Sequence, residues 1–112
     1  SVFMGRAPLA LLAIILGASG TMTPIPNLNP EIEGSLYKLV KEGDIEKVKR
    51  NIMKVQQIVK LYASTPNPIS STVKGIMSQL GLCKKYTAGF IPTMSNAEVN
   101  KMYGKYLAIL NN

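Results

Sequence analysis

The stretch Gly17–Pro30, GASGTMTPIPNLNP, decides how the chain folds. It places a small-residue turn, four residues that can form a strand and a proline- and asparagine-rich loop between two helical segments. Because Gly20–Thr23 follows the preceding helix after only a glycine-bearing turn, this connection is typical of the links from helix to strand in parallel sheets. A short apolar run, Ser1–Gly5, comes before that helix and predicts a first strand. The opening of the chain therefore predicts strand, helix and strand, with the two strands parallel.

The segment Arg6–Leu16, RAPLALLAIIL, predicts the helix between the two strands. Pro8 suits the first helical turn, and Gly17 suits the position just after the last one. A signal peptide is the alternative, with Arg6 as its charged region, Leu9–Leu16 as its apolar region and a cleavage site near Ala18–Gly20. The apolar run is too short to span a membrane. Pro8 before it and the strand-like segment after it favour a buried helix and no membrane partner.

The remainder of the chain predicts four helices. Apolar residues recur at helical spacing between clear start and stop signals. Pro66 and Pro68 disfavour helix in the residues before them, so Ser64–Pro68 is expected to be a break. The expected helices are a first one from Pro30 to Glu42, a long one capped by Asp44, a third over Ile69–Leu80 and a last one opened by the capping box Ser95–Glu98.

The chain has 112 residues, no histidine and one cysteine, Cys83. The absence of histidine removes the commonest general base and metal ligand, and a single thiol cannot form an internal disulfide or a multi-thiolate site. We therefore expect no metal, no haem and no Ser-His-Asp chemistry. A lone cysteine fits a reducing compartment, and a cytoplasmic location is expected.

Thirteen Lys and Arg against six Asp and Glu give a formal charge of +7. Lys47, Arg50 and Lys54 share one helix face, which raises the question of an acidic partner such as nucleic acid. No aromatic residues interleave with these charges, so a solvated helix face is the favoured interpretation and no nucleic-acid partner is expected. A non-enzymatic basic helical interaction module is an alternative hypothesis for the whole chain.

Five segments in order carry a resemblance to a known family. They are FMG at Phe3–Gly5, GASGTMTPIPN at Gly17–Asn27, LYKLVKEGDIEKV at Leu36–Val48, PNPIS with VKGIMSQLGL between Pro66 and Leu82, and FIPTMS at Phe90–Ser95. Together they resemble the C-terminal part of the dihydrodipicolinate synthase and N-acetylneuraminate lyase superfamily, which are Schiff-base aldolases and synthases on a (β/α)₈ barrel.

The resemblance implies an α/β fold that is predominantly helical within this chain. Residues 1–42 would form the last two strands of a TIM barrel with their helices, and residues 43–112 would form a C-terminal helical extension. The loop after Thr23 would then lie at the C-terminal face of the barrel, where the loops that follow strands build active sites. The rigid backbone of the opening stretch would belong to that face.

The resemblance implies a lyase or synthase that joins pyruvate or another 2-keto acid to an aldehyde, without a cofactor. The family's imine-forming lysine and its proton-relaying tyrosine lie on strands before Ser1, so no catalytic residue is expected here. Gly5 and Met22 match positions beside the bound keto acid, and Gly20 would allow a close backbone approach. A turn requirement for the glycines and a core-filling role for Met22 are the alternatives.

Arg6-Ala7 stands where many dihydrodipicolinate synthases have acidic residues. This departure leaves a 2-keto-3-deoxy sugar-acid aldolase of the same superfamily as an alternative function. The resemblance also implies a homo-oligomer, either a dimer or a tetramer, with the helical extension in subunit contacts.

Overall fold

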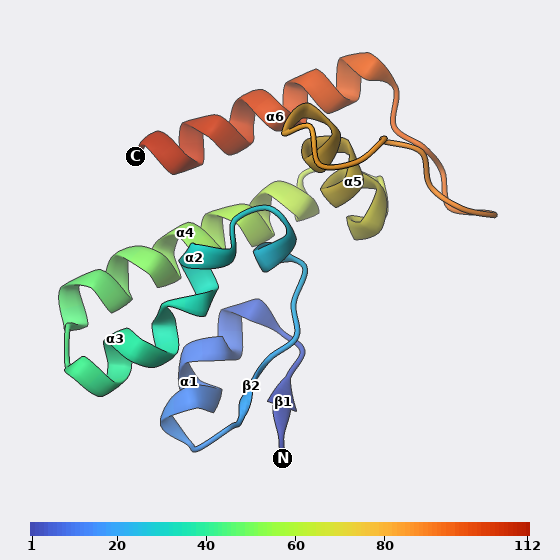
Figure 1. Ribbon diagram of the computed structural model, residues 1–112. Helices are drawn as coiled ribbons and strands as arrows, with labels where there is room; N and C mark the ends of the chain where they lie inside the picture. Colours follow the sequence, from blue (N-terminus) through green and yellow to red (C-terminus); the bar gives the residue numbers. More distant parts are fainter. The chain divides into compact units, whose positions relative to one another are not determined.

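Two short parallel strands begin the structure, a computed structural model that describes residues 1–112. Strand β1 (Phe3–Met4) pairs with β2 (Gly20–Thr21), with Phe3 opposite Gly20 and Met4 opposite Thr21. The predicted parallel pair is confirmed, as Figure 1 shows, but both strands are shorter than the expected Ser1–Gly5 and Gly20–Thr23. Each strand has a hydrogen-bonded neighbour on one side only. A sheet of two strands is marginally stable by itself, so the pairing stays short.

The helix between the strands begins with a tighter turn than expected. The predicted single helix over Arg6–Leu16 is a 3₁₀ turn, η1 (Ala7–Leu9), followed by α1 (Ala10–Ile15). Pro8 has no N–H, and the Leu9 N–H donates to the Arg6 carbonyl, three residues back, at 2.9 Å. Gly17 ends α1 as predicted: its φ is 88°, and the Ala18 N–H donates to the Ala13 carbonyl at 2.8 Å.

The predicted helix from Pro30 to Glu42 is wrong in one respect, because it is divided. It forms α2 (Pro30–Gly34) and α3 (Leu36–Glu42), with Ser35 between them. The Ser35 hydroxyl donates to the Glu31 carbonyl at 2.7 Å and accepts from the Asn51 amide at 2.8 Å. A serine that bonds the preceding turn next to a glycine bends a helix, which explains the division.

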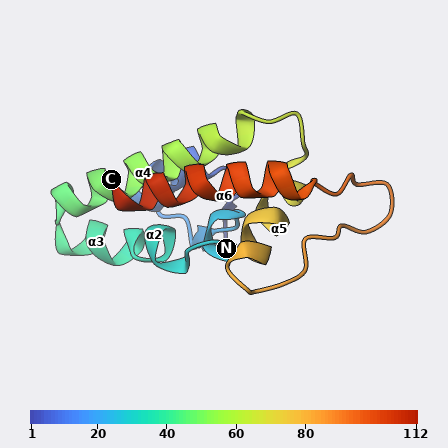
Figure 2. The same cartoon turned by 90° about the horizontal axis from the view of Figure 1, so that it is seen from above.

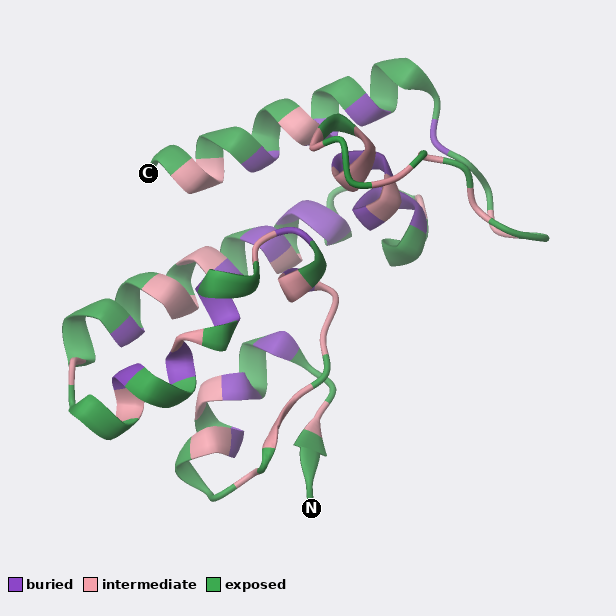
Figure 3. Ribbon diagram, in the orientation of Figure 1, coloured by how far each residue is buried: buried purple, intermediate pink, exposed green.

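The first of two compact units spans Ser1–Val59, and the second spans Lys60–Asn112. Helix α4 (Ile45–Ala63) begins in the first unit and ends in the second. The core of the first unit joins α1, α3 and α4 through four buried residues: Ala10, Leu36, Leu39 and Val48. Figure 3 marks the buried positions on these helices, and Ile32, Leu36 and Leu39 are the buried apolar residues of Pro30–Glu42. Another short turn, η2 (Ile25–Asn27), packs against α2.

The second unit is built on two packed helices, α5 (Ile69–Gln79) and α6 (Asn96–Asn111). They approach closely at Gly75, where a β-carbon would lie 3.1 Å from Val99 Cγ2 and 3.3 Å from Met94 Sδ. The break at Ser64–Pro68 and the helix that follows it are confirmed. The segment between α5 and α6 extends away from both helices in the two views of Figures 1 and 2.

The capping box at the start of α6 is confirmed and makes the stability of this end pH-dependent. The Ser95 N–H donates to Glu98 Oε2 at 2.8 Å, and the Asn67 amide donates to Glu98 Oε1 at 3.1 Å. Hydrogen bonds from the Ser95 hydroxyl, the Ser95 N–H and Asn67 lower the pKa of Glu98 from its usual 4.5 to about 2.

We expect the helix α6 cap to lose its stabilising effect in acid. Because the folded-state pKa of Glu98 is depressed, its contribution is fully present above pH 4.5 and is lost as the pH falls towards about 2. Thermal unfolding of the wild type and of Glu98→Gln, measured from pH 7 to pH 2, checks this. The wild type should be the more stable at pH 7, and the two should converge near pH 2. A difference in melting temperature that is independent of pH would contradict the prediction.

Candidate substrate-binding edge

Gly5 and Met22 lie at the same edge of the two-stranded sheet. Each directly follows the carboxyl end of its strand, because β1 ends at Met4 and β2 ends at Thr21. The Met22 N–H donates to the Met4 carbonyl at 2.9 Å, so the pairing continues one residue beyond β2. The structure therefore brings together the two residues that the resemblance assigns to substrate binding.

Gly5 has no structural requirement for glycine within this chain. Its φ is not in the left-handed region, in contrast to Gly17 and Gly43. A β-carbon at Gly5 would have no heavy atom within 4 Å, and the residue is exposed. Neither a turn nor close packing among residues 1–112 explains the glycine, so the space beside it is open to a group that these residues do not supply.

Met22 does not fill the core of this chain. Its side chain is 75% exposed, so the core-filling alternative does not describe it here. Gly20, in contrast, has a packing reason that the sequence did not reveal: a β-carbon there would lie 3.0 Å from Cε1 of Phe3 on the neighbouring strand. The group that lies close to Gly20 is therefore the Phe3 ring on β1.

A contact that the sequence analysis missed lies directly after Met22. The Thr23 hydroxyl donates a hydrogen bond to Glu33 Oε2 across the loop between β2 and α2. The Glu33 side chain is only 3% exposed. The sequence carried a signal for this burial, since Glu33 precedes Leu36 by three residues and Val40 by seven and so shares the apolar side of the helical segment. An acidic residue in the first turn of a helix also has an ordinary explanation in the helix dipole.

The edge contains no lysine from this chain. The first lysine is Lys38, in α3, and it pairs with Glu42 at 3.7 Å. In the predicted basic stripe, Lys47 is paired with Asp44 at 2.7 Å, and the hydrogen bond from Lys47 lowers the pKa of Asp44. No group of three or more His, Cys, Asp or Glu residues could hold a metal ion. None of the helices combines the length and the apolar character that crossing a membrane requires.

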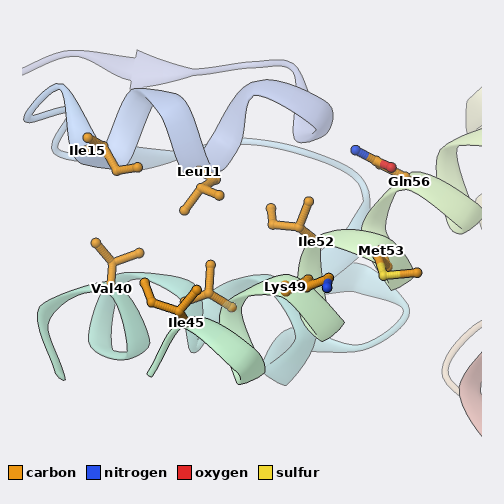
Figure 4. Close-up of a pocket in the computed structure, with 9 residues that line it drawn as sticks. Leu11, Ile15, Val40, Ile45, Lys49, Ile52, Met53 and Gln56 are labelled. Atoms are coloured by element: carbon orange, nitrogen blue, oxygen red, sulfur yellow. The ribbon is translucent and has the colours of Figure 1, made fainter. Parts of the chain in front are cut away.

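An apolar groove of about 420 Å³ lies in the first unit, between α1, α3 and α4. In Figure 4, Leu11 and Ile15 on α1 lie on one side, with Val40 and Ile52 opposite them. Three of the large apolar side chains that line the groove are exposed to solvent: Ile15, Ile45 and Met53. So much exposed apolar surface in one place is typical of an interaction surface.

Known proteins share both the sequence and the fold. The model of the dihydrodipicolinate synthetase family matches residues 1–104. The probable 2-dehydro-3-deoxy-D-pentonate aldolase of Escherichia coli is 32% identical over 82 residues, which are 73% of this chain and 27% of that protein.

Two solved structures extend the likeness to nearly the whole chain. Dihydrodipicolinate synthase from Bacteroides thetaiotaomicron is 29% identical with a TM-score of 0.86, over 96% of this chain and 37% of that one. Dihydrodipicolinate synthase from Aquifex aeolicus is 28% identical with a TM-score of 0.77, over 99% of this chain and 37% of that one. The chain thus spans a little over a third of the length of these relatives.

Proposed function

The chain belongs to the dihydrodipicolinate synthetase family, and from this we propose that it is the C-terminal part of a Schiff-base lyase or synthase that acts on pyruvate or a related 2-keto acid. The family match over residues 1–104 carries the proposal. Strands β1 and β2 would be the last two strands of a (β/α)₈ barrel, and residues 43–112 would form its helical extension. The edge that holds Gly5 and Met22 would then belong to the C-terminal face, where such barrels have their active sites.

In this enzyme the reactive amine comes from a lysine on an earlier strand. Its nitrogen attacks the keto carbon of pyruvate, water leaves, and an imine forms. Loss of a proton from the neighbouring carbon converts the imine to an enamine, and that carbon then bonds to the carbonyl carbon of the aldehyde, whose oxygen takes up a proton. Gly5 would leave room for the keto acid, and the backbone carbonyl of Met22 would lie beside it. The single cysteine supports a reducing, cytoplasmic setting for this chemistry.

A borohydride trap tests the reaction class in the full-length protein that contains residues 1–112. Borohydride delivers hydride to the imine carbon and converts the imine to a stable secondary amine. We expect the mass of the protein to rise by one reduced pyruvyl group, located on one lysine outside residues 1–112. An unchanged mass would rule out the Schiff-base mechanism.

A 2-keto-3-deoxy sugar-acid aldolase is the second candidate. The relative from Escherichia coli is named for such a substrate and is 32% identical. Arg6-Ala7, in place of acidic residues, points the same way. Comparing kcat/KM for aldehydes derived from sugars with that for aspartate semialdehyde separates the two candidates.

We further propose that the enzyme is a homo-oligomer and that the apolar surface around Ile15, Ile45 and Met53 contacts a second subunit. Ile15 is 62% exposed in this chain, and a charge placed there would have to be buried in the contact. We expect Ile15→Asp to reduce the oligomer to smaller species in light scattering coupled to gel filtration. The matched control is Ile69→Asp, at an isoleucine that is 53% exposed on α5. An Ile15→Asp protein of unchanged mass but lower melting temperature would show that the surface packs within one subunit instead.

A further inference from the structure

Thr23 is held in place by a buried carboxylate. It lies two residues beyond the end of β2 and directly after Met22. Its hydroxyl donates to Glu33 Oε2, which joins the first part of the loop after β2 to helix α2.

The Glu33 carboxylate is buried without a charged partner. Its side chain is 3% exposed, and the ion pairs of this chain join Lys38 to Glu42 and Lys47 to Asp44. Glu33 Oε1 is also buried and has no hydrogen-bond partner among residues 1–112. Burying a carboxyl oxygen without a hydrogen-bond donor is unfavourable. An apolar side chain would fill the same space more favourably, so packing alone does not explain a glutamate at this position.

The start of helix α2 does not account for this burial. Asn29 already caps the helix, because its side-chain oxygen accepts from the N–H groups of Glu31 and Ile32 at 3.1 and 3.3 Å. Helix α2 has only five residues, and Glu33 is the fourth of them. Its carboxylate is directed to Thr23 instead.

The contact fixes the backbone at the end of β2. On one side the Met22 N–H is bonded to the Met4 carbonyl, and on the other Thr23 is bonded to Glu33. Pro24 and Pro26 follow Thr23, and the ring of each proline fixes its own φ angle. Movement of the Met22 carbonyl is therefore limited by β1 before it and by Glu33 after it.

We propose that Glu33 is a positioning residue for the substrate-binding edge. Through Thr23 it holds the Met22 carbonyl where the 2-keto acid is bound. The inference rests on the proposed function, because it assigns Glu33 a role in the same site.

Steady-state kinetics of the full-length enzyme test this role. Thr23→Val removes the hydroxyl at nearly constant volume, and Glu33→Met replaces the carboxylate with a side chain of similar length that offers no oxygen acceptor. We expect each change to raise KM for the 2-keto acid about tenfold, with kcat changing less than about threefold. Thr23→Ser keeps the hydroxyl and should restore KM to within about twofold of the wild type. The control is Glu42→Gln, which removes an exposed carboxylate that pairs with Lys38.

A double-mutant cycle on the unfolding equilibrium tests the contact independently of activity. The changes in unfolding free energy caused by Thr23→Val and Glu33→Met should not add up in the double variant. The discrepancy should correspond to about a factor of ten in the unfolding constant. The proposal is overturned by additive effects, by an unchanged KM in Glu33→Met, or by a Thr23→Ser protein as impaired as Thr23→Val. Strong coupling in a protein that forms no imine would overturn the proposed function and the positioning role with it, and would leave the contact as a structural one.

Discussion

A protein limited to residues 1–112 should gain no pyruvyl group at a specific site when it is treated with pyruvate and borohydride. The full-length enzyme should be modified completely at one lysine under the same conditions. An imine-forming lysine needs a lowered pKa, which comes from desolvation or a cationic neighbour. The chain has no lysine before Lys38, which lies on α3 beside the carboxylate of Glu42. The strand ends therefore lack the reacting amine.

The measurement is the intact mass followed by peptide mapping of the modified residue. Any exposed amine reacts slowly with pyruvate, so the same chain unfolded in denaturant is the control for nonspecific adducts. A stoichiometric adduct on a single lysine of the folded 1–112 chain, absent from the unfolded control, would show that the catalytic amine lies within this chain.

Replacing Gly5 with valine should reduce kcat/KM of the full-length enzyme by about a hundredfold, because a displaced substrate loses its alignment for reaction. Within this chain a β-carbon at Gly5 meets nothing within 4 Å, and its φ is not in the left-handed region. The substitution is therefore expected to leave folding intact and to act on the space that the keto acid occupies. Gly5→Ala should cause a smaller loss in the same direction.

Gly104→Ala is the matched control. Gly104 lies in α6, where a β-carbon also meets nothing within 4 Å. We expect its kcat/KM to stay within about twofold of the wild type, as for surface changes away from a site. Melting temperatures of the variants separate binding from folding. A fully active Gly5→Val enzyme would remove Gly5 from the site, and a loss of activity that follows a loss of folded protein would show a structural role.

Much of the fold could be predicted because the sequence motifs that indicate it span only a few neighbouring residues. The parallel pair was indicated by the glycine turn between α1 and β2, and the capping box by Ser95 and Glu98. The division at Ser35 was missed because apolar spacing continues across it, from Ile32 to Leu36 and Leu39. What bends the helix there is a serine hydroxyl bonded to the preceding turn and to Asn51, sixteen residues further along the chain.

The candidate site was predicted only in outline. The family resemblance indicated Gly5 and Met22, and the structure places them at one edge. Glu33 was missed because an acidic residue early in a helix has an ordinary local explanation, and spacing alone does not show which oxygen is buried. The sequence also did not reveal why a glycine occupies position 20, since the reason is the close contact with the ring of Phe3 on the other strand.

The sequence by itself determined the family, the parallel pairing of β1 and β2, and most helix ends. Each of these follows from residues a few positions apart, such as a proline that lacks an N–H or a glycine at positive φ. Only the tertiary structure decided which groups are buried and what they contact. Thr23 and Glu33 are ten residues apart and meet because the loop after β2 folds back, with η2 packed against α2. Burial of the carboxylate depends on that packing, and no local pattern specifies it.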